Sequence, residues 1–220
     1  MAYFRCGGGG SYKPESYIYN IGNCAFNTNH IHTANTKVVF KAEIEPFYAP
    51  NGYGIVFGAR NNNYNANAFG FDGRFGGNRY CFFRTGREQA GDLYDSQSSS
   101  SPYPAFETCI FTAEGNKIEW YREKDDTVIR SITATGSTVN DGIAPMAIFA
   151  GNKSSQSNGW DLTDYAVMKL YWFEIYENDT LIHKFIPAYN NNQYCLYDTV
   201  THTYIYDTVN NGANVKGFIN

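Results

Sequence analysis

Residues 167–187, VMKLYWFEIYENDTLIHKFIP, restrict the fold more than any other part of the chain. The first ten of them alternate with a period of two, whereas a helix would repeat its apolar residues every three or four positions. The alternation predicts one face built from Tyr171, Phe173 and Ile175. It assigns to the opposite, outward face the row Leu170, Trp172, Glu174 and Tyr176.

A turn and a second extended run follow in the same segment. Residues 177–180, Glu-Asn-Asp-Thr, include two side chains that tolerate a left-handed backbone. Residues 181–185 resume the extended pattern, and Pro187 stops the pairing because its nitrogen has no hydrogen to donate. The segment therefore predicts a β-hairpin.

Short extended runs recur along the whole chain. Residues 36–44 alternate cleanly, with one side formed by Val38, Phe40, Ala42 and Ile44. We expect about ten to thirteen such strands, separated by Gly-, Asn- and Ser-rich turns, and no helix longer than one or two turns. This spacing is typical of an all-β, two-sheet sandwich.

Residues 172–207 read F-x-I-Y, a turn, L-x-x-x-F-I-P, and then L-Y-D followed by Y-x-Y, at Phe173, Ile175, Tyr176, Leu181, Phe185, Ile186, Pro187, Leu196, Tyr197, Asp198, Tyr204 and Tyr206. This pattern resembles the closing segment of the laminin-G-like, concanavalin A-like jelly-roll domains of gut bacteria and their phages. Cys195 stands where that family has a glycine. Residues 15–45 resemble the opening of the same family, and residues 54–60, GIVFGAR, match its L-F-G-A-R motif.

The resemblance implies an antiparallel jelly-roll sandwich over residues 12–220, closed by pairing of the first and last strands. Residues 1–11 precede it as a short arm, in which four glycines form a flexible tether. Two interpretations of the arm stay open, a frayed terminus and an anchor that buries Tyr3 and Phe4 against a partner.

Composition and charge exclude several classes of function. The net charge of −4 argues against nucleic-acid binding, which needs a basic surface. No apolar run of membrane-spanning length occurs, and the first residues do not read as a signal peptide, so we expect synthesis in a cytoplasm and no membrane partner. The five cysteines are scattered without a C-x-x-C pair, which favours reduced thiols in or near the core.

The sequence offers no clear catalytic or metal-binding set. Glucanases of related folds place two carboxylates at i and i+4 on one strand, and no such pair is present, so we expect no enzyme activity. His30 and His32 are too few to indicate a metal site, and His183 is expected at the surface. We expect no cofactor, although the resemblance allows calcium at Asp161 and Asp164.

Two sets of residues are candidates for binding. Sugar recognition needs aromatic faces and planar amides, and the loops supply both in Arg60, Asn62, Tyr64, Asn158 and Trp160. Asn-rich loops are also simple turn formers, and that interpretation stays open. An outward row of Leu170, Trp172 and Tyr176 implies a face covered by a loop of this chain or by a partner.

These observations lead to one functional hypothesis and two alternatives. The first is a non-catalytic protein on the surface of a phage virion, a capsid-decoration, head-fibre or tail-associated protein. Its arm would bind other virion proteins or its own copies, and its sandwich would bind host or mucosal glycans. The alternatives are a carbohydrate-binding module of a gut bacterium and a glucanase-like hydrolase.

Overall fold

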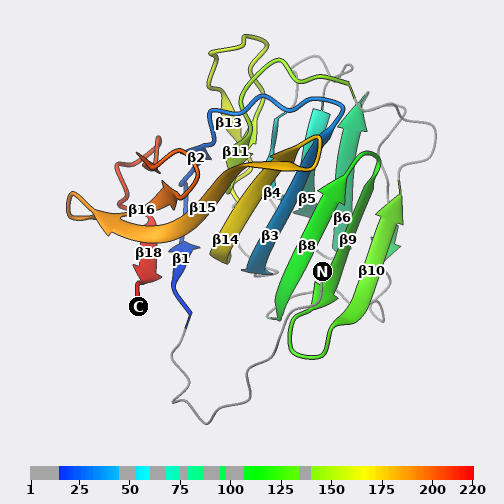
Figure 1. Ribbon diagram of the computed structural model, residues 1–220, viewed down its shortest axis with the longest axis horizontal. Coiled ribbons are helices and arrows are strands. Elements are labelled where there is room, and N and C mark those ends of the chain that lie inside the picture. Colours follow the sequence, from blue (N-terminus) through cyan, green and yellow to red (C-terminus); the bar gives the residue numbers. More distant parts are fainter. Residues whose placement is uncertain are drawn as a thin grey trace.

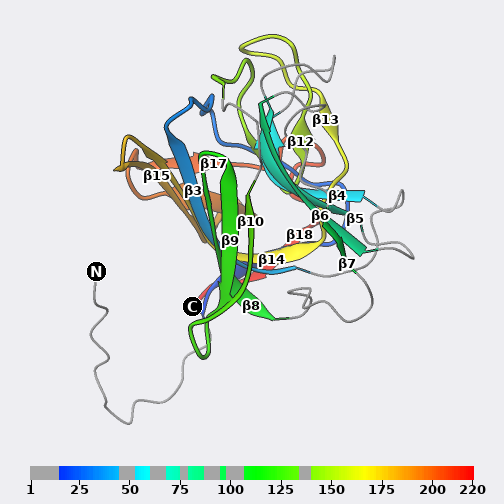
Figure 2. The same cartoon turned by 90° about the vertical axis from the view of Figure 1, so that its right-hand side faces the viewer.

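The described residues form two β-sheets that pack face to face and contain no helix (Figure 1, Figure 2). The computed structural model describes residues 15–44, 53–59, 68–74, 79–86, 95–97, 107–133 and 140–220. Within these ranges no helix has the length and hydrophobicity of a membrane span. The architecture is the all-β, two-sheet jelly-roll sandwich that the sequence predicts. The arm at residues 1–11 lies outside the described ranges.

The larger sheet has ten strands in the order β10-β9-β8-β3-β14-β15-β16-β17, with β1 pairing with β14 and β18. In chain order these are β1 (Tyr17–Asn20), β3 (Thr36–Ile44), β8 (Thr108–Glu114), β9 (Lys117–Arg122), β10 (Thr127–Thr133), β14 (Met168–Glu177), β15 (Thr180–Asn190), β16 (Gln193–Asp198), β17 (Thr203–Ile205) and β18 (Val215–Phe218).

The smaller sheet has the order β13-β12-β4-β5-β6-β7, and β11 pairs with both β4 and β2. Its strands are β2 (Phe26–Asn27), β4 (Tyr53–Ala59), β5 (Ala68–Arg74), β6 (Arg79–Gly86), β7 (Asp95–Gln97), β11 (Ala147–Ile148), β12 (Gly151–Asn152) and β13 (Leu162–Thr163). Four of them have only two residues, too short to show a period of two, which explains why the described chain has more strands than the sequence predicts. The β12–β4 contact is parallel, whereas the other strand pairings are antiparallel.

The predicted hairpin is β14–β15, closed by the two-residue turn Asn178–Asp179 between Glu177 and Thr180. Both turn residues have positive φ, 48° and 60°, as a type I′ turn requires. Asn and Asp accept this conformation more readily than other residues with a Cβ atom. The sequence therefore identified both the hairpin and the chemistry of its turn.

The predicted outward row on β14 is wrong at Leu170, which is fully buried in the core. Leu170 pairs with Ala42 while Trp172 pairs with Lys41, the next residue of β3, so Tyr171 is the extra residue of a β-bulge. One extra residue moves every later side chain to the opposite face. Met168 and Leu170 point inward before the bulge, and Phe173 and Ile175 point inward after it.

Aromatic rings fill the space between the sheets. Phe40 of β3 stacks on Phe111 of β8 with ring centroids 4.6 Å apart, and Phe57 of β4 meets Phe40 and Phe173 from the other sheet at 5.5 Å each. The predicted inward side of β3 is confirmed, since these residues are all buried: Val38, Phe40, Ala42 and Ile44. Aromatic pairs in this geometry add to the hydrophobic free energy of burial.

The first and last described strands pair with each other, as the resemblance implies. β1 pairs antiparallel with β18 from Tyr17–Phe218 to Asn20–Val215, so the first and last strands lie side by side (Figure 1).

Three cysteines within the described residues, Cys24, Cys109 and Cys195, are buried free thiols, as predicted. Burial raises the pKa of Cys109 to about 12, so that thiol stays protonated and unreactive at neutral pH.

Candidate functional site

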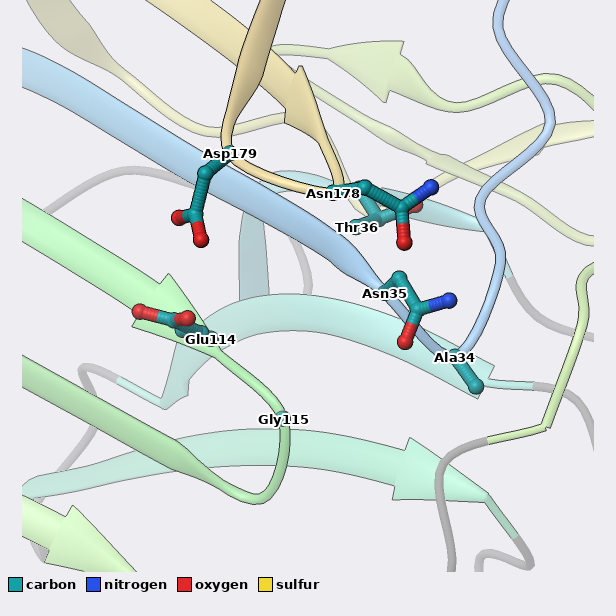
Figure 3. A pocket seen from close by; sticks show the side chains of 7 residues that line it. All are labelled: Ala34, Asn35, Thr36, Glu114, Gly115, Asn178 and Asp179. Carbon is teal, nitrogen blue, oxygen red and sulfur yellow. The ribbon is translucent and has the colours of Figure 1, made fainter.

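Three turns meet at one end of the larger sheet and enclose a polar hollow, which we call the rim pocket. Its volume is about 370 Å³, and it is lined by Ala34, Asn35, Thr36, Glu114, Gly115, Asn178 and Asp179. The neighbouring strands β8, β3 and β14 bring these turns together, although they are far apart in the sequence. Figure 3 shows the two carboxylates on one side of the hollow and the two amides on the other.

Each turn has a local reason for its shape. Asn178 and Asp179 form the type I′ turn of β14–β15, and Gly115 takes a φ of 56° in the turn between β8 and β9. The third turn is stabilised by Thr33 and Thr36, because the Thr33 N–H donates to Thr36 Oγ1 at 2.7 Å and the Thr36 N–H donates to the Thr33 carbonyl at 3.2 Å. The lining is therefore built from well-defined turns.

A lysine lies between the two carboxylates. Lys37 Nζ is 3.8 Å from Glu114 Oε2 and 3.4 Å from Asp179 Oδ1, and it also lies 5.4 Å from the centre of the Tyr176 ring. The Glu114 and Asp179 side chains are 59% and 82% exposed, so both carboxylates remain hydrated. Exposed pairs of this kind contribute little to stability, which leaves these groups free to exchange partners with a ligand.

A partly buried hydrogen-bond network adjoins the pocket. Glu177 accepts from the Thr33 hydroxyl at 2.6 Å and from the Thr36 hydroxyl, and it lies 2.9 Å from Nε2 of His30. The His30 ring contacts the His183 ring edge to face, with centroids 5.9 Å apart. Burial lowers the pKa of His30, although Glu177 opposes that shift. This network fixes the turn at residues 33–36 against the end of β14.

His183, which the sequence predicts at the surface, is mostly buried, and His30 and His32 are buried or partly buried. His32 is fully buried and stacks on Phe69 at 5.4 Å, while His30 lies beside Glu177, so the two rings do not converge. His183 Nδ1 lies 2.7 Å from Asp198 Oδ2, and the His183 side chain is only 20% exposed. Among the described residues no three His, Cys, Asp or Glu side chains gather as a metal site.

The predicted loop residues are dispersed or lie outside the described ranges. Arg60, Asn62, Tyr64, Tyr3 and Phe4 fall outside them.

Trp160 is half buried and attaches its loop to other segments of the chain. Its Nε1 donates to Thr208 Oγ1 at 2.9 Å, and its ring packs on a small cluster of buried alanines. Asn158 is exposed in the turn that precedes it.

Asp161 and Asp164 act through their backbones. The Asp161 carbonyl accepts from the Lys153 N–H at 2.7 Å, and the Asp164 carbonyl accepts from the Ile55 N–H at 2.6 Å. The first contact closes the loop at residues 151–164 on itself, and the second attaches it to β4; calcium binding at the two carboxylates stays a prediction.

The rim pocket was missed because its residues read as ordinary turn formers. The Asn178–Asp179 turn was predicted, but its convergence with the turn around Gly115 depends on the order β8-β3-β14 in the sheet. Strand order is a non-local property that the alternation of single segments does not encode.

The pocket presents neutral and charged hydrogen-bonding groups, and its lining includes no buried acid, base or nucleophile. Amides donate and accept at one planar group, hydroxyls do both at one atom, and carboxylates accept at two oxygens. Such a set suits a ligand rich in hydroxyl groups.

Comparison with known proteins identifies only distant structural likenesses. No protein-family model matches the sequence, and no curated protein matches it. One similar structure is the native heptameric SAP-like pentraxin from Limulus polyphemus, at 10% identity and a TM-score of 0.40 over 79% of this chain and 74% of that one. Another is a family 7 alginate lyase A1-II′ variant in complex with its substrate, at 12% identity and a TM-score of 0.38 over 71% and 67% of the two chains.

Proposed function

We propose that the chain is a non-catalytic protein that binds glycans through the rim pocket. The observation that carries this proposal is the lining itself, in which amides of Asn35 and Asn178 face carboxylates of Glu114 and Asp179 across an open hollow of about 370 Å³. Sugar hydroxyls both donate and accept, so a lining that mixes these groups can satisfy several of them at once.

The absence of catalysis is part of the proposal. Hydrolysis of a glycoside needs one carboxylic acid that stays protonated near neutral pH, and desolvation is the usual means of achieving this. Glu114 and Asp179 are both largely exposed, and Lys37 lies within 4 Å of each. Neither carboxylate has the desolvated surroundings that a general acid of this kind needs, so the pair suits binding better than acid catalysis.

We place this activity on a phage virion, where the chain would be a decoration, head-fibre or tail-associated protein. Support comes from the resemblance at residues 15–45 and 172–207 and from the glycine-tethered arm that precedes the sandwich. Mass spectrometry and electron microscopy of purified particles test the placement. Particles that lack the chain would refute it without affecting the proposal of glycan binding.

Binding is tested with an array of mucin-type and bacterial surface glycans, followed by calorimetry on the strongest hit. Asn35→Ala removes an exposed amide, and Asp179→Asn removes a charge while keeping a residue that tolerates positive φ. We expect each change to weaken binding at least tenfold. Calcium and a chelator are compared in parallel to test the predicted ion dependence.

A matched control comes from the opposite end of the same sheet. Asp126 is exposed and has a φ of 54° in the β9–β10 turn, so Asp126→Asn makes the same chemical change away from the pocket. Equal loss of binding in Asp126→Asn and Asp179→Asn would show a general charge effect and would refute the pocket. Reducing ends released from a bound glycan would refute the non-catalytic part.

A further inference from the structure

Three tyrosines lie next to one another on β16, on β17 and directly after β17, and we call them the tyrosine row: Tyr197, Tyr204 and Tyr206. Tyr197 and Tyr204 are directly opposite each other on paired strands, with ring centroids 4.8 Å apart. The Tyr206 ring follows at 6.5 Å from Tyr204 and is nearly parallel to it, at 28°. Tyr204 is 45% exposed, so a large aromatic surface faces solvent in the middle of the row.

Polar side chains hold the rings at the two ends of the row. The Tyr206 hydroxyl accepts from Nδ2 of Asn190 at 2.7 Å and from Nδ2 of Asn191 at 3.1 Å. A phenolic oxygen has two lone pairs and one hydrogen, so these two bonds leave its hydrogen for a further acceptor. At the other end of the row, the Tyr197 hydroxyl lies 3.1 Å from Nδ1 of His202.

This combination has a specific chemical complement. A pyranose ring has one face of C–H groups that packs on an aromatic ring, and it has hydroxyls at its edge that need hydrogen-bond partners. The side chains of the row and their hydrogen-bonding partners include no carboxylate or lysine. We propose that the tyrosine row binds a neutral oligosaccharide of at least two pyranose units, because the row continues beyond the area of one ring.

The tyrosine row is separate from the rim pocket. The pocket lies at the Thr180 end of β15, whereas Tyr197 pairs with Ile186, six residues further along that strand. At about 3.3 Å per residue, the two sites are about 20 Å apart along the strand. Either site can therefore exist without the other, and their failures are distinguishable by mutation.

The test measures binding of tetrasaccharides of β-1,4-linked glucose, xylose, mannose and galactose. Saturation-transfer NMR identifies which of them bind, and calorimetry gives the affinity. We expect at least one of them to bind, and Tyr204→Ala to weaken that binding at least tenfold. Tyr204→Phe, which keeps the ring, should stay within threefold of the unchanged protein.

Tyr189→Ala is the matched control. Tyr189 of β15 is 56% exposed and pairs with Tyr194 of β16, which lies three residues from Tyr197 and therefore on the other face of that strand, so its removal deletes a similar ring outside the row. We expect Tyr189→Ala and Asn35→Ala to leave tetrasaccharide binding unchanged. Shifts of the Tyr197, Tyr204 and Tyr206 ring resonances on titration of the unchanged protein give a second readout that needs no variant.

Three outcomes would overturn the proposal. The first is that none of the four tetrasaccharides binds, and the second is that Tyr204→Ala binds as well as the unchanged protein. The third is that sedimentation shows a dimer that Tyr204→Ala converts into a monomer, while none of the sugars shifts the tyrosine ring resonances. That result would identify the row, at the edge strand β17, as a contact between copies of the chain.

Discussion

We expect a substitution at Asp207 that keeps the side-chain volume to destabilise the sandwich more than any other change of shape so small. Its side chain is buried and accepts hydrogen bonds from four backbone N–H groups. Oδ1 accepts from Ala25 and Val209 at 3.0 Å each, and Oδ2 accepts from Asn210 and Gly212 at 3.1 Å each. One carboxylate therefore joins the segment after β17 to the segment before β2.

Asp207→Asn keeps the volume but replaces one acceptor oxygen with a donor NH₂ group. Two of the four N–H groups then face another donor and lose their hydrogen bonds. A hydrogen bond to a charged group contributes about 1.5–3 kcal/mol, and water can reach part of the segment at residues 209–212, so we expect a loss of about 2–4 kcal/mol.

Urea unfolding followed by tryptophan fluorescence measures this loss. In a protein of this size about 1 kcal/mol lowers Tm by roughly 2–4 °C, so thermal unfolding should shift by roughly 4–16 °C. Asp126→Asn, at an exposed turn, is the control and should change stability by less than about 0.5 kcal/mol. A loss below about 1 kcal/mol in Asp207→Asn would refute the claim that this carboxylate holds the two segments together.

Three further predictions concern buried groups. Burial lowers the pKa of His32 from 6.5 to about 4, so stability should fall by about 3 kcal/mol as pH drops through that window, and His32→Phe should remove the slope in urea titrations. Although burial opposes it, hydrogen bonds from His183, Thr201 and backbone N–H groups lower the pKa of Asp198 from 3.8 to about 2. Stability present above pH 3.8 should therefore fall by about 2 kcal/mol toward pH 2, and less in Asp198→Asn. Leu170→Ala should cost about 2–5 kcal/mol in urea unfolding, whereas a loss below about 1 kcal/mol would contradict the inward placement.

Local patterns in the sequence predicted the parts of the fold that depend on neighbouring residues. The β14–β15 hairpin follows from alternation on both sides of two residues that accept positive φ, and β3 follows from its unbroken alternation. The bulge at Tyr171 was missed because the alternation was read with a single phase along the whole strand, whereas an extra residue reverses the phase after it.

The candidate sites depend on contacts that no single segment encodes. The rim pocket needs β8, β3 and β14 to be neighbours, and the tyrosine row needs Tyr197 to pair with Tyr204. Tyr204 and Tyr206 were recognised only as positions of a family pattern, since a period of two places them on one face without showing what lies beside them. Pairing register supplies that missing information.

The buried carboxylate of Asp198 and the tyrosine row, the proposed binding surface, are connected through the same short turn. Asp198 accepts from the Lys184 and Val200 N–H groups at 3.0 Å each and from the Thr201 hydroxyl at 2.6 Å, which fixes the turn between β16 and β17. Tyr197 precedes Asp198 and Tyr204 follows this turn, so the turn sets the distance between their rings. A surface that is ordered before binding loses less conformational entropy when a ligand arrives. Polar groups buried on one face of β16 thus explain how aromatic rings on its other face can remain exposed and still hold a defined arrangement.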